Sequence, residues 1–148
     1  MNNFRKHNRP QPRQGDKTSW NNVAGWYDKL VGDRGSDYHQ NVIIPGALKL
    51  LSPQKEEKVL DVACGQGVFC RALADIGTNV NGIDNSPQLI QAAQKRSRTI
   101  NAKYIVSDAT NLKRFNNLSF DAVSCIMAIQ NIDPLEKAIA EFGRVLKP

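Results

Sequence analysis

Three aspartates and a pair of glycines, each placed at the end of an apolar run, are the residues of this 148-residue chain that could do chemistry. The stretch VLDVACGQG carries Asp61 and then Gly65 and Gly67, while Asp84 and Asp108 follow two later apolar runs. Glycine adopts positive φ angles readily and lets a ligand approach the backbone closely. A glycine pair in this setting is therefore typical of a turn that binds a nucleotide-like ligand.

The surroundings of the glycine pair narrow the class of nucleotide. A phosphate-binding loop of the GxxxxGK[ST] type needs a lysine that is absent at that spacing. A dinucleotide fingerprint needs GxGxxG, and Cys70 stands where the third glycine would be. Asp61 is poorly placed for a phosphate and well placed for a cationic ligand. These residues favour a nucleoside that bears an amine and no phosphate, with an NAD-binding domain as an alternative.

The apolar patterns that surround these residues predict a single α/β domain. Short apolar runs predict four strands, at 58–63, 79–84, 103–106 and 120–129. Apolar residues at helical spacing predict helices at 19–31, 38–51, 68–76, 87–98 and 134–146, the second interrupted at Pro45 and Gly46. Strands that alternate with helices predict a parallel sheet with helices on both faces, which binds its ligand at the carboxyl ends of the strands.

Three local signals refine the limits of these elements. Ser86 is expected to cap the helix that begins at Pro87. Asp133, with Glu136 three residues later, is expected to form a capping box for the last helix. The run 120–129 is nearly all apolar, as expected for a central buried strand.

Composition and charge place the chain among globular proteins. Hydrophobic residues make up 41% and charged residues 23% of the sequence. No apolar run reaches the roughly 20 residues that a membrane helix needs, and the N-terminus lacks the layout of a signal peptide. We therefore expect a cytoplasmic protein with no membrane insertion.

The first 18 residues differ from the rest and are expected to form a disordered basic tail. Residues 1–17 hold five basic residues against Asp16 alone, so this segment carries +4 of the net charge of +6. A basic arm could bind RNA phosphates, and a solvated leader is the alternative. The three cysteines have no CxxC spacing, which argues against a disulfide framework or a metal site.

The motifs together resemble a known family. VLDVACGQG resembles motif I of the class I S-adenosylmethionine-dependent methyltransferases, and the stretches NGIDNSPQLIQAA, YIVSDATNL, FDAVSCIMAIQNIDP and EFGRVLKP resemble its later motifs in order. WNNVAGWYDKL resembles the tyrosine-containing N-terminal helix of many members. The resemblance implies a Rossmann-like methyltransferase domain over residues 19–148. The family's sheet has seven strands and only four are predicted here, so we expect an incomplete, C-terminally truncated domain that keeps the cofactor-binding part.

The resemblance also implies S-adenosylmethionine as cofactor and assigns roles to single residues. Asp61 and the two glycines would line its methionine part, Asp84 would accept hydrogen bonds from both ribose hydroxyls, and Asp108 would accept one from the adenine amino group. Met127 would lie near the sulfonium, and Tyr27 would cover the site. The predicted cofactor-binding residues are Tyr27, Asp61, Ala63, Gly65, Gly67, Asp84, Asn85, Asp108, Ala109 and Met127.

The function implied is methyl transfer to a small-molecule acceptor, with no catalytic residue identified. Many relatives carry a histidine after the fourth strand, where this chain has Gln130 and Asn131, neither of which is a useful base. Two alternatives stay open. One is an RNA methyltransferase that uses the basic tail, and the other is a non-catalytic module that binds S-adenosylmethionine or a protein partner.

Overall fold

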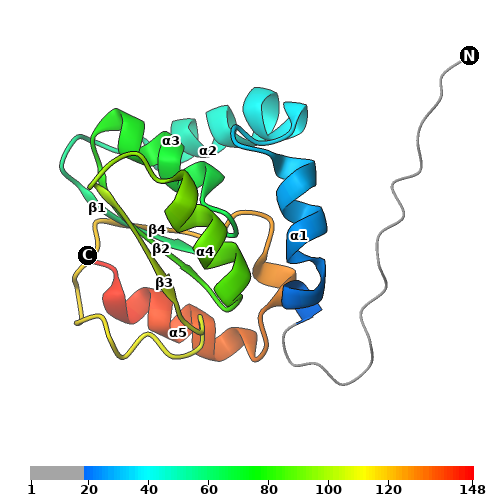
Figure 1. The fold of residues 1–148 in the computed structure, drawn as a ribbon. Coiled ribbons are helices and arrows are strands. Elements are labelled where there is room, and N and C mark those ends of the chain that lie inside the picture. The colour runs from blue at the N-terminus through cyan, green and yellow to red at the C-terminus, as the bar shows by residue number, and fades with distance from the viewer. Residues whose placement is uncertain (1–18) are drawn as a thin grey trace, which may run out of the picture.

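The computed structural model of the protein describes residues 19–148 and contains a four-stranded parallel sheet packed against helices (Figure 1). The strands lie in the order β3-β2-β1-β4, which confirms the predicted α/β fold with a parallel sheet. Their bounds are β1 (Lys58–Val62), β2 (Asn79–Asp84), β3 (Ala102–Val106) and β4 (Ala122–Ser124). The basic tail predicted for residues 1–18 lies outside the described residues.

The register of the sheet brings the ends of the strands to one edge. Val62 at the end of β1 pairs with Ile83 in β2, and Asp84 at the end of β2 pairs with Val106 at the end of β3. Because all the pairs are parallel, the chain leaves every strand at this same edge. The segments that follow the strands are therefore neighbours in space.

Helices precede and connect the strands, largely where the apolar spacing predicts them. They are α1 (Ser19–Val31), a π-helix (His39–Ile43), α2 (Ile44–Leu51), α3 (Val68–Ile76), α4 (Pro87–Arg96), a 3-10 helix (Ile129–Asn131) and α5 (Leu135–Val145). The Ser86 hydroxyl caps α4 by accepting a hydrogen bond from the Leu89 N–H at 3.3 Å, as predicted. Within residues 19–148, no helix has both the length and the apolar character needed to cross a bilayer.

Two apolar cores form because successive strand residues point to opposite faces of the sheet. Val59 of β1 is buried in the core that α3 and α4 cover, together with Leu73. The next residue, Leu60, is buried in the other core together with Val145 of α5. Both faces of the sheet are thus covered by helices. The carboxyl ends of the strands are left open to a ligand.

The fourth strand is shorter than the predicted 120–129 and lies at an edge of the sheet. Its ladder with β1 ends at Ser124, after which Met127 adopts a φ of +53° and a 3-10 helix follows. The prediction of a long central strand is wrong. An apolar run indicates that residues are buried, but it does not show that they form hydrogen bonds with a neighbouring strand. Part of the apolar run packs beside the cores instead of continuing the ladder, as Cys125 and Ile126 do.

The capping box predicted at Asp133 is also absent. Pro134 occupies the N-cap position of α5 with φ −78° and ψ 134°, and no side chain bonds this end of the helix. Asp133 therefore lies one residue too early to cap, and Glu136 lies one residue too close to the cap for the reciprocal bond.

The interruption expected near Pro45 takes the form of a widened turn. The Ile44 N–H donates to the carbonyl of His39, five residues earlier, and this defines the π-helix. Pro45 follows in the first turn of α2, where its missing N–H is tolerated. The widened turn places His39 at the start of this helical segment.

Candidate cofactor-binding site

A cavity of about 950 Å³ lies at the carboxyl ends of the strands. One part, here the strand-end wall, comprises Ala63, Gly65, Asp84, Asn85, Ser86, Ser107, Asp108 and Ala109. A second part, the N-terminal wall, comprises Trp20, Tyr27 and His39. The third part, the rim, comprises Ile126, Met127, Ala128, Asn131, Ile132 and Asp133. In Figure 1, α1 lies on the side of the sheet where the strand arrows end, so it covers the cavity.

The two glycines of the turn between β1 and α3 have different surroundings. Both have left-handed backbones, with φ of +57° at Gly65 and +81° at Gly67. Gly65 lines the cavity, where its missing side chain leaves room for a ligand. Gly67 does not line the cavity, and a Cβ added there would lie 2.6 Å from Cε1 of Tyr104. Gly67 is thus required by the packing of the turn against β3.

Asp84 presents a fixed carboxylate to the cavity. Its Oδ2 accepts a hydrogen bond from the Gly65 N–H at 2.9 Å, and its Oδ1 accepts one from the Ser86 N–H at 2.8 Å. Burial raises the pKa of Asp84, against the effect of these two bonds. Each oxygen keeps further lone pairs, so the carboxylate can accept two more hydrogen bonds from a ligand with adjacent hydroxyls.

Asp61, at the end of β1, is buried and does not line the cavity. Its Oδ1 accepts a hydrogen bond from the Ser124 hydroxyl at 2.7 Å, and its Oδ2 accepts one from the Cys70 thiol at 3.2 Å. Burial, opposed by these bonds, raises its pKa to about 6. Asp61 therefore ties β1 to β4 and α3, and its contact with a cofactor ammonium stays a prediction.

Asp108 and Ala109 line the cavity beyond β3. The Asp108 Oδ1 accepts hydrogen bonds from the Thr110 N–H and hydroxyl, both at 2.8 Å, which fixes the turn. The side chain is exposed, so its other oxygen can meet a ligand amine. Met127 lines the rim, with 59% of its surface exposed.

Tyr27 lies over the glycine turn. A Cβ added at Gly65 would lie 3.4 Å from Cε1 of Tyr27 and 3.9 Å from its hydroxyl oxygen. Burial, followed by the charges of Asp84 and Asp61, raises the pKa of Tyr27. Trp20 packs edge-on against the Tyr27 ring with centroids 5.7 Å apart. The phenol is thus a neutral donor held beside the turn.

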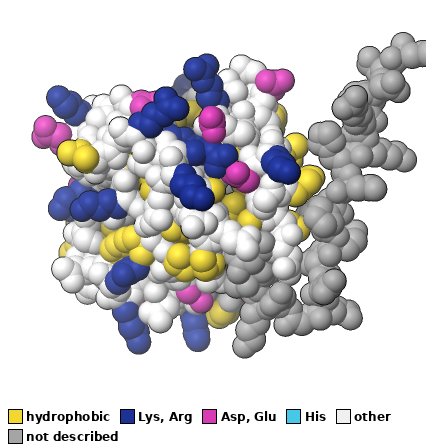
Figure 2. All heavy atoms as spheres, viewed as in Figure 1, with side chains coloured by type: hydrophobic (Ala, Val, Ile, Leu, Met, Phe, Trp, Pro, Cys, Tyr) yellow, Lys and Arg dark blue, Asp and Glu magenta, His cyan; other side chains and the backbone are white. Residues whose placement is uncertain are grey.

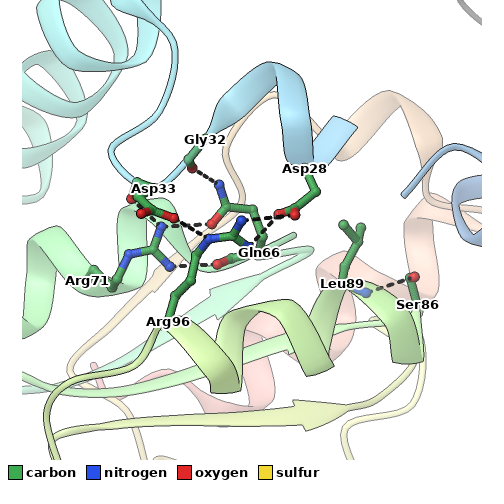
Figure 3. Close-up of polar contacts among 8 residues, drawn as sticks. All are labelled: Asp28, Gly32, Asp33, Gln66, Arg71, Ser86, Leu89 and Arg96. Carbon is green, nitrogen blue, oxygen red and sulfur yellow. Dashed lines mark hydrogen bonds and ion pairs between the residues drawn. The ribbon is translucent and has the colours of Figure 1, made fainter. Parts of the chain in front are cut away.

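A polar network, here called the clamp, fixes the N-terminal wall to the rest of the molecule (Figure 3). Arg96 of α4 makes a two-pronged ion pair with Asp28 of α1, with Nη2 to Oδ2 at 2.9 Å. Its Nε donates to Asp33 Oδ1 at 2.7 Å. The Arg96 and Asp28 side chains are only 23% and 26% exposed, which strengthens this pair relative to a fully solvated one.

Gln66, the residue between the two glycines, completes the clamp from inside. This buried side chain donates from Nε2 to the Gly32 carbonyl and accepts at Oε1 from Arg71 Nη2 at 2.7 Å. Arg71 also donates to the Asp33 carbonyl at 2.8 Å. The glycine turn and the end of α1 are therefore bonded to each other directly.

Most of the predicted residues line the cavity, whereas Asp61 and Gly67 lie behind its surface. Several lining residues are missing from the prediction, among them Trp20 and His39 of the N-terminal wall. Trp20 shares a helical spacing with Tyr27, a signal that could have identified it. His39 has no partner at a metal-binding spacing, so the sequence offers only its place after a glycine-containing loop.

Comparisons with known proteins identify the family. The methyltransferase domain family matches residues 60–148. The demethylmenaquinone methyltransferase of Chlorobaculum tepidum is 34% identical over 140 residues, which cover 92% of this chain and 57% of that protein. The chain spans about half the length of the curated relatives it matches.

Solved structures agree with this match. The crystal structure of a Pyrococcus horikoshii protein aligns with a TM-score of 0.70 and 34% identity, covering 84% of this chain and 61% of that one. The phosphoethanolamine N-methyltransferase 2 of Haemonchus contortus, in complex with S-adenosyl-L-methionine, aligns with a TM-score of 0.75 and 25% identity, covering 88% and 31%. With the parallel sheet and the glycine turn described above, these matches show that the chain belongs to the class I S-adenosylmethionine-dependent methyltransferases.

Proposed function

We propose that this chain binds S-adenosylmethionine in the cavity and takes part in methyl transfer to a small-molecule acceptor. The observation that carries the proposal is the Asp84 carboxylate, which two backbone N–H groups hold at the end of β2, facing the cavity. A fixed carboxylate matches the two adjacent ribose hydroxyls of the cofactor and would repel a 2′-phosphate.

Other lining residues support the same ligand. Gly65 leaves space beside the turn for its methionine part, and Asp108 and Ala109 offer an acceptor and an N–H for its adenine. The charged residues that line the cavity within residues 19–148 are Asp84, Asp108 and Asp133. An acidic cavity suits a ligand that carries a sulfonium and an ammonium. Ala63, Asn85 and Met127, which the sequence also predicts to bind the cofactor, line the strand-end wall and the rim.

The size of the cavity and the names of the relatives favour a small acceptor. A single small ligand occupies a pocket of about 300–1,000 Å³, so this volume is at the upper end of the range and leaves room beside the cofactor. Apolar side chains of Trp20, Ile126 and Ile132 face that space. The relative named demethylmenaquinone methyltransferase points to a planar quinol-type acceptor.

The RNA alternative has less support from the described surface. On the face that Figure 2 shows, Lys and Arg side chains are dispersed with Asp and Glu among them and do not form one basic stripe. A nucleic-acid site usually gathers its basic residues on one face or along one helix. Deletion of residues 1–17 tests this alternative, because loss of salt-sensitive RNA binding would support it.

The chemistry divides between cofactor and protein. When bound, the cofactor would supply a methyl group activated by its sulfonium. An acceptor atom would bond to this carbon as the methyl–sulfur bond breaks, S-adenosylhomocysteine would leave, and the acceptor proton would pass to solvent. The residues of this chain orient the ligand, through Asp84 at the ribose, and exclude water, through the N-terminal wall over Gly65. The rim would face the acceptor, because Met127 and Ile132 line the cavity and 59% of the Met127 surface is exposed.

Calorimetric titration with S-adenosylhomocysteine tests the proposal. The parent chain is expected to bind, and Asp84→Asn to bind about 10- to 100-fold more weakly, because two charge-assisted hydrogen bonds are weakened. Asp133→Asn is the matched control, since it removes the same charge from the rim of the same cavity. A folded parent that fails to bind, or an Asp84→Asn variant that binds like the parent, would contradict the proposal.

Turnover separates an enzyme from a module that only binds. Incubation of the chain with S-adenosylmethionine and a demethylated naphthoquinol is expected to yield S-adenosylhomocysteine. Binding without turnover across quinol and catechol acceptors would favour the non-catalytic alternative.

A further inference from the structure

We infer that His39 binds the carboxylate of the methionine part of S-adenosylmethionine, an inference that rests on the proposed function. His39 begins the π-helix and lines the cavity as part of the N-terminal wall. Neither the sequence motifs nor the family match assigns it a role, because the matched region begins at residue 60.

The packing of His39 places it beside the glycine turn. A Cβ added at Gly35 would lie 2.6 Å from the Cβ of His39 and 3.2 Å from a methyl group of Val68. Val68 is the first residue of α3 and follows Gly67 directly. Because Val68 follows the glycine turn, this packing supports a position of His39 near Gly65 and Tyr27, where the methionine part of the cofactor is proposed to lie.

The described charged residues that line the cavity offer no positive partner to the carboxylate of the methionine part. Among the described residues, every lining side chain that is charged at neutral pH is an aspartate, and no lysine or arginine lines the cavity. Arg71, nearby on α3, is occupied by Gln66 and by the Asp33 carbonyl. His39 is the one lining side chain of residues 19–148 that can carry a positive charge, and burial lowers the pKa of its ring, so a bound carboxylate would have to stabilise that charge.

The orientation of the imidazole suits a hydrogen-bond donor. The Nδ1 atom of His39 lies 2.8 Å from the Ser36 hydroxyl oxygen, which also accepts the His39 N–H at 3.4 Å. If the hydroxyl proton is donated to Nδ1, the neutral ring carries its own proton on Nε2. The charged ring carries a proton there as well. In this neutral tautomer and in the charged ring Nε2 is a donor, which fits a carboxylate better than it fits removal of a proton from an acceptor.

The test compares two ligands that differ only in the carboxylate. The full chain is titrated with S-adenosylhomocysteine and with its decarboxylated analogue, S-adenosyl-3-thiopropylamine. The parent is expected to bind the first about 10-fold or more tightly than the second, as a charge-assisted hydrogen bond would give. In His39→Ala this preference should fall to about twofold or less, through weaker binding of S-adenosylhomocysteine alone.

Two further variants separate contact from packing. His39→Gln keeps a donor of similar reach without the charge and should retain part of the preference. Gln40→Ala removes a hydrogen bond from Nε2 to the Gly35 carbonyl, 3.0 Å long, and so loosens the same loop without touching the cavity. It should leave the preference as in the parent.

The outcomes are distinct from those that test the proposed function. A parent that binds both ligands equally overturns the role of His39 without reference to any variant. A His39→Ala variant that loses affinity for both ligands to the same extent overturns it too, because the residue would then act through packing. A parent that binds neither ligand overturns the proposed function and this inference together.

Discussion

The strand-end wall and the N-terminal wall face the same cavity, but different forces hold them in place. The strand-end wall follows from backbone geometry: the turn begins with the Cys64 N–H bonded to the Ile83 carbonyl at 2.9 Å, and the Gly65 N–H bonds Asp84. The N-terminal wall is held by side chains, mainly by Arg96 on Asp28 and by Gln66 on Gly32. The strand-end wall is thus formed by the segments that directly follow the strands, whereas the N-terminal wall is joined to them by side-chain hydrogen bonds and ion pairs.

Because of this difference, substitutions near the two walls should affect different properties of the protein. Changes behind the strand-end wall should lower the stability of the whole domain, since the wall cannot move without the sheet. Changes in the clamp should leave the sheet folded and act on ligand affinity, because they release a helix that packs mainly on α4. Three substitutions test the contrast, in order of decreasing effect.

The largest effect is expected from Gly67→Ala. The new Cβ would meet the Tyr104 ring at 2.6 Å, and the residue would have to keep a φ of +81°. Overpacking costs up to about 3 kcal/mol and a left-handed alanine about 1 kcal/mol, so the free energy of unfolding should fall by about 4 kcal/mol.

Urea unfolding measures this change, with Gly143→Ala as the matched control. Gly143 lies in α5 with nothing within 4 Å of an added Cβ, so the same substitution there should raise stability by up to about 1 kcal/mol. Equal effects at the two glycines would show that the turn is not fixed by its packing.

An intermediate effect that depends on pH is expected from Asp61→Asn. Burial raises the carboxyl pKa from 3.8 to about 6, so the folded protein holds this proton more tightly than the unfolded chain. The contribution of Asp61 to stability therefore falls as pH rises from about 4 to 6, by about 3 kcal/mol in all. Because the unfolded carboxyl is already partly ionised at pH 4, the difference in unfolding free energy between parent and variant should shift by most of this amount, about 2 kcal/mol, between pH 4 and pH 7.

Asp121→Asn provides the control of opposite sign for this measurement. The hydrogen bond from Lys147 lowers the pKa of Asp121, so its contribution is present at neutral pH and is lost on acidification. If the Asp61→Asn difference does not change with pH, folding does not raise the pKa of Asp61.

The smallest effect is expected from Arg96→Ala. Loss of the pair with Asp28 should loosen α1 and weaken binding of S-adenosylhomocysteine by about threefold, with little change in the unfolding of the sheet. The affinity of the parent should approach that of the variant at high salt, because part of the clamp is exposed. Lys95→Ala removes the same charge from the neighbouring, exposed position and should bind as the parent does. A threefold loss in both variants would assign the effect to net charge.

The same contrast explains what could be predicted from the sequence. The first three strands depend on apolar periodicity, and α3 depends on apolar periodicity and on Gly77 at its end. These are local signals, and the four elements lie within a residue of their predicted limits. The positions of the strand-end residues could be predicted from these strands, because the carboxyl ends of parallel strands lie side by side. The rest depends on contacts between distant parts of the chain: Asp28 and Arg96 are 68 residues apart, and no local pattern pairs them.

Two errors near the rim have the same origin. The apolar run after Phe120 and the Asp-Pro pair before α5 both carry strong local signals, and tertiary structure overrides each of them. His39 was missed because a lone histidine has no local partner, and its neighbours in the cavity come from α1 and the strand ends.

The hydrogen bond of the Gln66 amide also limits which segment can move to let a ligand enter or leave the cavity. Because this one side chain bonds the end of α1 and sits between Gly65 and Gly67, an outward swing of α1 must break a buried hydrogen bond and disturb the turn. Movement of the segment 127–131 breaks no such tie, since the Gln130 side chain bonds only the nearby Met127 carbonyl. By this hydrogen bond alone, the exposed segment at the rim is less constrained than α1.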